Sequence, residues 1–274
     1  MSAPEAPAVV FDRVSFAFDA HVILREVSFT LPRGRMMILL GASGSGKSIL
    51  LKLILGLLRP DSGAIHVNGH RVDTMSERDL LVLRADIGML FQESALFDSL
   101  TVAENVGYRL DEETETTEDQ VRQRVQEVLG FIGLGDYTER MPSELSGGQR
   151  RRVAIARAMA SKPRLLLFDD PTTGLDPLTA TTVDDEIVKL RDLEQVASIV
   201  VTHQIRDAYY VAQHQAVRTP GGGFEIVEVG GGASRADFMV LHDGEIRFEG
   251  SGPELLASQD GYLKEFLFMT LPPW

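Results

Sequence analysis

The chain has 274 residues, of which 44% are hydrophobic and 24% are charged, proportions that are typical of a folded globular protein. Its net charge of -13 argues against non-specific binding to nucleic acid, because that binding needs Lys and Arg to displace counterions from the phosphates. The lack of any cysteine excludes disulfides and thiolate metal sites.

The N-terminal part of the sequence predicts strands, then a loop and a helix. Residues 9–18 and 22–31 are rich in β-forming residues, as in an antiparallel pair of strands. Residues 36–40, "MMILL", form a continuous apolar run, which is typical of a strand buried on both faces. A glycine-rich loop follows, and then a helical run from Lys47 to about Leu58 that a proline closes.

The middle of the sequence has a helical pattern. After an acidic segment at residues 111–119, apolar residues recur at helical spacing on one face: Val121, Val125, Val128, Leu129 and Ile132. We therefore expect a helical subdomain at residues 93–160. It would be inserted into an α/β core that comprises residues 1–92 and 161–250.

The core pattern then resumes. Strands are predicted at residues 165–169 and 198–202, and helices at 177–193 and 205–214. Further along, two glycine clusters predict a surface insertion, a hairpin or a loop, and "DFMVLHDGEIRFEG" predicts a hairpin that turns at Asp-Gly. The expected insertion covers residues 217–235, the turn is Asp243-Gly244, and a helical tail is expected over residues 251–274.

The strongest motif is "GASGSGKS", which lies between a predicted strand and a predicted helix. Its glycines let successive amides turn inward around phosphates, and the N-terminus of the helix adds favourable potential. Lys47 is expected to reach the outer phosphates, and Ser48 to offer a hydroxyl to Mg²⁺. The residues expected to bind the phosphates of a nucleotide here are Gly41, Ala42, Ser43, Gly44, Ser45, Gly46, Lys47 and Ser48.

Two adjacent carboxylates, Asp169 and Asp170, follow the apolar run at residues 165–168. A charge at the end of a buried strand is costly unless a cation or hydrogen bonds meet it. In phosphate-loop NTPases, a carboxylate at the end of a neighbouring strand helps to hold the magnesium shell. We expect Asp169 to take that role.

A second candidate phosphate site is "LSGGQ" at residues 145–149, which precedes a helical run. Taken alone, its serine and glycines could equally be a helix cap. Together with the phosphate loop, the stretch resembles the signature of ATP-binding cassette (ABC) ATPases, and the resemblance covers nearly the whole chain. It implies that the signature of one protomer closes over ATP held by a second copy. The signature residues are Ser146, Gly147, Gly148 and Gln149.

The resemblance also implies a fold: an α/β P-loop NTPase with a mostly parallel, RecA-like core, an N-terminal antiparallel β subdomain and an inserted α-helical subdomain. It further implies that Phe18 stacks on adenine, and that Gln92 senses magnesium, the attacking water and the membrane partner. Residues 173–176 would cross the dimer interface, and His203 would contact the γ-phosphate. Ser48, Gln92 and Asp169 would form the metal site.

Asp170 departs from the family pattern, in which a glutamate polarises the attacking water. Aspartate is one methylene shorter, and a positioned general base contributes about 10²–10⁴-fold in rate. Our hypothesis is that Asp170 still orients the water, with slow basal hydrolysis and a long-lived closed dimer.

A single cassette without a predicted membrane span resembles the separate ATPase subunit of a transporter, held by a permease at the cytoplasmic face of the inner membrane. Residues 93–106 and 141–148 resemble Mla/Mce-type ATPases, which power phospholipid traffic across the bacterial envelope. That resemblance implies an MlaE-like permease docked at Leu96 and Phe97, and an Mce-domain lipid-binding protein. Two alternatives stay open: the ATPase of an importer of small polar solutes, and an envelope signalling ATPase of the cell-division type.

Overall fold

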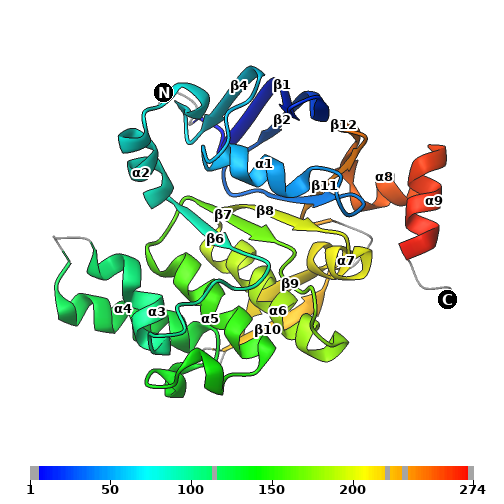
Figure 1. The fold of residues 1–274 in the computed structure, drawn as a ribbon. Helices are drawn as coiled ribbons and strands as arrows, with labels where there is room; N and C mark the ends of the chain where they lie inside the picture. Colours follow the sequence, from blue (N-terminus) through cyan, green and yellow to red (C-terminus); the bar gives the residue numbers. More distant parts are fainter. Residues whose placement is uncertain (1–5, 113–115, 220–222, 230–233, 271–274) are drawn as a thin grey trace, which may run out of the picture.

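The computed structural model describes residues 6–112, 116–219, 223–229 and 234–270 (Figure 1). Within these residues, the central sheet has six strands in the order β12-β11-β3-β8-β7-β6. Neighbouring strands from β11 to β6 are parallel, and β12 is antiparallel to β11. The bounds are β3 Met36–Leu40, β6 Ile87–Leu90, β7 Leu165–Asp169, β8 Ala197–Thr202, β11 Asp237–His242 and β12 Glu245–Ser251. The predicted α/β class is therefore confirmed.

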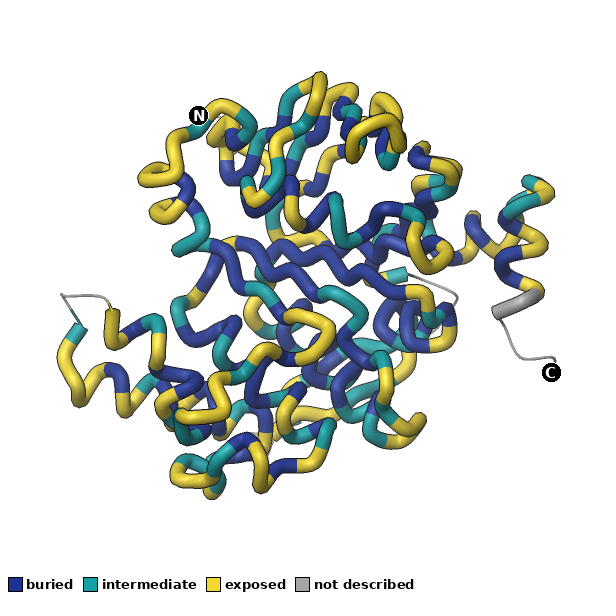
Figure 2. The backbone as a smooth tube through the Cα atoms, viewed as in Figure 1, coloured by how far each residue is buried: buried dark blue, intermediate teal, exposed yellow. Residues whose placement is uncertain are grey.

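Both faces of this sheet are covered, as the dark blue strands in the middle of Figure 2 show. Side chains alternate between two apolar cores, because successive residues of a strand point to opposite faces. In β3, Met36, Ile38 and Leu40 belong to the core shared with the helices at residues 147–160, 177–189 and 205–213. Met37 and Leu39 belong to the core shared with the N-terminal sheet and the helix at residues 47–54. All five residues of β3 are buried, as the sequence predicts.

The N-terminal sheet has the strand order β2-β1-β4-β5. Strands β1 (Val9–Phe18) and β2 (His21–Leu31) are antiparallel, which confirms the predicted pair. Strands β4 (Ser62–Val67) and β5 (His70–Arg71) continue the sheet, and α2 (Glu77–Ala85) follows.

Helix α1 (Lys47–Ile54) is shorter than predicted. Gly56 takes a φ of +63°, in the left-handed region that ends helices, so the chain leaves the helix before Leu58.

Helices α3 (Val102–Asp111), α4 (Glu118–Phe131) and α5 (Gly147–Ala160) form the inserted helical part of the fold. The predicted apolar face of α4 is buried. Helix α5 also packs against α6 (Pro177–Lys189), which continues into a π-helical turn at Leu190–Glu194. Helix α6 in turn packs against α7 (Ile205–Gln213). The exact limits of the subdomains, 1–92, 93–160 and 161–250, stay predictions.

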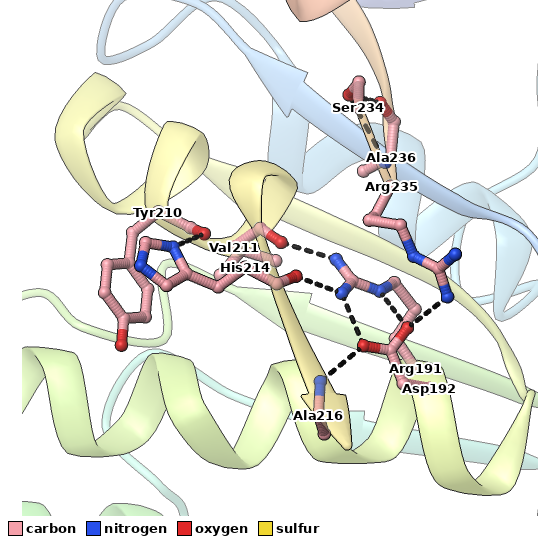
Figure 3. Close-up of polar contacts among 9 residues, drawn as sticks. All are labelled: Arg191, Asp192, Tyr210, Val211, His214, Ala216, Ser234, Arg235 and Ala236. Atoms are coloured by element: carbon pink, nitrogen blue, oxygen red, sulfur yellow. Dashed lines mark hydrogen bonds and ion pairs between the residues drawn. The ribbon is translucent and has the colours of Figure 1, made fainter. Parts of the chain in front are cut away.

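The predicted insertion begins with an antiparallel hairpin of β9 (His214–Arg218) and β10 (Phe224–Glu228). The π-helical turn anchors it (Figure 3). Arg191 donates to the carbonyl oxygens of Val211 and His214, and Asp192 accepts from the amide of Ala216. Residues 220–222 and 230–233 of the insertion lie outside the described residues.

The C-terminal part contains the predicted hairpin and helices. The turn between β11 and β12 is Asp243-Gly244, and both residues have positive φ, as a two-residue hairpin turn requires. Helices α8 (Gly252–Ala257) and α9 (Gly261–Thr270) follow, and residues 271–274 of the predicted tail lie outside the described residues. In the part of the chain that the structure describes, no helix combines the length and apolar character needed to cross a bilayer.

Candidate active site

The glycine-rich loop joins the end of β3 to the start of α1. Gly46 has a φ of +101° and precedes the first helical residue. A Cβ at Gly41 would lie 2.5 Å from the carbonyl oxygen of Leu241, and one at Gly46 would lie 2.9 Å from the side chain of Ile23. Both glycines are therefore required by close packing as well as by backbone conformation.

Lys47 is buried, with 6% of its surface exposed. Its Nζ donates to the carbonyl oxygens of Gly41 at 2.8 Å and Ala42 at 2.9 Å. Burial lowers the pKa of Lys47, while the carboxylates of Asp170 and Asp169 act in the opposite direction. The ammonium group is thus held over the loop where the outer phosphates of a nucleotide would lie.

Ser48 and Asp169 meet although 121 residues separate them: Ser48 Oγ donates to Asp169 Oδ1 at 2.9 Å. Burial raises the pKa of Asp169, and the hydrogen bond from Ser48 partly offsets this. Mg²⁺ prefers hard oxygen ligands and usually takes one or two carboxylates together with phosphate oxygens and water. A hydroxyl and a carboxylate beside a phosphate loop fit that ligand set.

Asp170 lies just beyond β7 with a φ of +45°. Its amide donates to the carbonyl oxygen of Val201 at 2.8 Å. Its Oδ1 accepts from the amide of His203 at 3.3 Å and lies 2.9 Å from His203 Nδ1. These contacts fix the carboxylate at the ends of β7 and β8, next to the candidate metal ligands.

Lys47, Ser48, Asp170 and His203 all line one cleft, which has a volume of 330 Å³. The structure brings nine of the predicted residues to its walls and adds two that the sequence did not single out, Ile23 and Ile49. Phe18 is half exposed and packs edge-on against Phe16, with ring centroids 4.9 Å apart. The lining residues are Phe18, Ile23, Ser43, Gly44, Gly46, Lys47, Ser48, Ile49, Gln92, Asp170 and His203.

Residues 24–173, which include the phosphate loop and both aspartates, match the ABC transporter family model. The chain belongs to the ABC transporter ATPase family.

The relatives of this chain are described as transport proteins for different substrates. It is 35% identical over 254 residues to the intermembrane phospholipid transport system ATP-binding protein MlaF of Escherichia coli K12, covering 93% of this chain and 86% of MlaF. It is 34% identical over 214 residues to the probable ribonucleotide transport ATP-binding protein mkl of Mycobacterium tuberculosis, covering 78% of this chain. The chain spans 60% of the length of that mycobacterial relative.

A similar solved structure is the dimeric ABC cassette MJ0796 in a post-hydrolysis state, bound to ADP and Pi. The match has a TM-score of 0.73 and 28% identity, and covers 89% of this chain and 98% of that one. It supports the fold that the resemblance implied.

The ABC signature residues do not line the cleft of their own chain. Ser146 caps α5: its side chain accepts from the amide of Gln149, whose side chain accepts from the amide of Ser146. A Cβ on Gly148 would lie 2.2 Å from Thr179 Cγ2 on α6. Gly148 is therefore also needed for helix packing, and Gly147 begins the helix beside it. The cleft of one chain is therefore formed without its own signature motif.

Sequence reasoning missed Arg151, whose buried side chain reaches the loops that follow β6 and β7. The only signal was a run of three arginines after the signature motif.

Proposed function

We propose that this chain is the ATP-hydrolysing subunit of an ABC transporter. It would act as a dimer on a separate permease at the cytoplasmic face of the inner membrane, and would power phospholipid movement across the cell envelope. The observation that carries the proposal is the meeting of Lys47, Ser48, Asp170 and His203 in one cleft. Asp169 is hydrogen-bonded to Ser48, and the signature motif lies elsewhere.

Each residue has a role in the proposed reaction. Lys47 would bind the outer phosphates, and Ser48 and Asp169, which are hydrogen-bonded to each other, would hold Mg²⁺ together with Gln92, which lines the same cleft. When bound, the metal would neutralise charge on the phosphates. Asp170 orients the attacking water and accepts its proton.

His203 holds the carboxylate of Asp170 in place and would contact the terminal phosphate. The signature of the second copy, led by Ser146, would close over the nucleotide. Because ATP binds the closed dimer more tightly than the open one, this difference in affinity supplies the work.

Phospholipid is proposed as the cargo because the similarity to MlaF extends over nearly the full length of this chain. A small polar solute is the second candidate, since mkl is described as a probable ribonucleotide transport protein. The test is to purify the chain with its membrane partner and to analyse bound lipids by mass spectrometry. Co-purified phospholipid and an Mce-domain subunit would support the first candidate. A solute-binding subunit without lipid would support the second.

The proposed permease contact involves fewer exposed residues than the sequence indicated. Leu96 is partly buried and packs against the main core, so it does not form an exposed pair with Phe97. Phe97 is 43% exposed, its ring lies 4.6 Å from that of Tyr108, and the guanidinium of Arg157 lies 5.8 Å from its centroid. Arg157 also donates to the carbonyl oxygens of Ser94 and Ala95. A docked partner at Phe97 would therefore contact the segment that follows Gln92.

Replacing Phe97 by Asp should abolish co-purification of the permease and leave ATP binding unchanged. An aromatic anchor at the centre of an interface contributes about 2–4 kcal/mol, and a carboxylate there would also be desolvated. Phe224→Asp is the matched control, because that ring is 37% exposed and lies on β10. The assay is pull-down of the membrane partner beside nucleotide binding. Retained pull-down in Phe97→Asp would contradict the docking site.

A further inference from the structure

Arg151 is a buried cation that joins α5 to two loops at the edge of the cleft. Its side chain is 6% exposed. One terminal nitrogen donates to the carbonyl oxygens of Phe91, at 2.9 Å, and Gln92. The other donates to the carbonyl oxygen of Thr173 at 3.3 Å. The planar fork of a guanidinium can serve acceptors on both sides at once, which the compact ammonium of lysine cannot do.

The two loops carry groups with proposed roles in the reaction. Gln92 lines the cleft. The amide of Thr173 donates to the carbonyl oxygen of Asp170 at 3.3 Å. Burial lowers the pKa of the Arg151 guanidinium, and the negative charge of Asp170 opposes that shift. Arg151 therefore binds the backbone of Gln92 directly and is linked to the backbone of Asp170 by two hydrogen bonds through Thr173.

The neighbouring arginines make no such link. Arg150 donates to the carbonyl oxygen of Leu145, and Arg152 donates to that of Ile132 at 3.1 Å. Both acceptors belong to the helical part of the fold. Within the run of three, Arg151 is the residue that ties the helix begun by the signature motif to the catalytic loops.

We propose that Arg151 is a positioning residue for hydrolysis, which makes the placement of Gln92 and Asp170 depend on the position of α5. When the signature at the start of α5 engages nucleotide, α5 would move. Arg151 would then move the loop of Gln92 and the loop of Asp170 together with the helix. The proposal rests on the proposed reaction, and assigns the link between signature and catalytic loops to one side chain.

Arg151→Lys keeps the positive charge and removes the fork. We expect kcat for ATP to fall about 10- to 100-fold, since a misplacement of about 1 Å can cost that much. KM and the affinity for a fluorescent ATP analogue should change less than about twofold, because the phosphate loop is untouched. Arg152→Lys, on the same helix, should keep the wild-type kcat.

A double-substitution cycle separates positioning from general destabilisation. If Arg151 acts through Asp170, Arg151→Lys should cause a much smaller further fall in single-turnover rate when Asp170 is already Asn. An unchanged kcat in Arg151→Lys, an equal fall in Arg152→Lys, or a full further fall in the Asp170→Asn background would each overturn the proposal. Should the lysine variant not fold, Arg151→Gln, which keeps one amide donor group, is measured in the same way.

The proposed reaction can fail separately. Wild-type turnover of Asp170→Asn alone would refute the role of Asp170. The comparison of Arg151→Lys with Arg152→Lys would still decide whether the arginine link sets the rate.

Discussion

Replacing Asp170 by Asn should lower the turnover number for ATP by about 10²–10⁴-fold, the usual contribution of a positioned general base. The side-chain amide of asparagine has nearly the same shape as the carboxylate, so its oxygen can still accept from the backbone N–H of His203. It cannot accept the proton of water. Binding of ATP should persist, because Lys47 and the glycine-rich loop are unchanged. Steady-state hydrolysis and binding of a fluorescent analogue measure the two effects separately.

Asp170→Glu tests whether the shorter side chain slows the reaction. It restores the length that is usual in the family, so we expect turnover above that of the wild type. Asp119→Asn is a suitable control, because this carboxylate is 92% exposed on α4. If Asp170→Asn hydrolyses ATP as fast as the wild type, Asp170 is not the catalytic base.

Lys47→Met should weaken ATP binding by about 10- to 100-fold, the equivalent of losing a charged hydrogen bond worth about 1.5–3 kcal/mol. The folded protein should not lose stability without nucleotide. Burial lowers the pKa of Lys47, so the charged amine costs free energy in the folded state, and methionine fills a similar volume without that cost. This gain offsets the loss of the hydrogen bonds that Lys47 donates to the carbonyl oxygens of Gly41 and Ala42.

Thermal unfolding with and without magnesium and ATP measures both parts of this expectation. The wild type should gain stability from the ligand by mass action, and Lys47→Met should gain little. Lys52→Met, an exposed position on the same helix, should respond as the wild type does. A full ligand-induced rise in the unfolding temperature of Lys47→Met would contradict the role given to this lysine.

Local chemistry in the sequence predicted the elements that position the site. The apolar run of β3, the strand that ends at Asp169 and the Asp243-Gly244 turn all formed as expected. The predicted end of α1 was wrong, because Gly56 and not the later proline stops the helix. Leu96 was expected to dock the permease together with Phe97, but it is partly buried and packs against the main core.

The link made by Arg151 could not be predicted from residue types. Its acceptors are the backbone carbonyls of Phe91, Gln92 and Thr173, and every residue has a carbonyl. By contrast, the contact of Ser48 with Asp169 follows from two side chains with recognisable chemistry in recognisable places. The placement of the signature away from the cleft also needed the fold, since both motifs lie at the starts of helices in one chain.

The most direct test of the account is nucleotide retention by a mixed dimer, purified with two tags, of Lys47→Met in one copy and Ser146→Arg in the other. If each nucleotide lies between Lys47 of one copy and Ser146 of its partner, the mixed dimer has one seam with both substitutions and one seam with neither. It should retain a non-hydrolysable ATP analogue with magnesium through gel filtration, while neither substituted homodimer does. A mixed dimer that retains no nucleotide, as expected if each copy builds its site alone, would contradict the account.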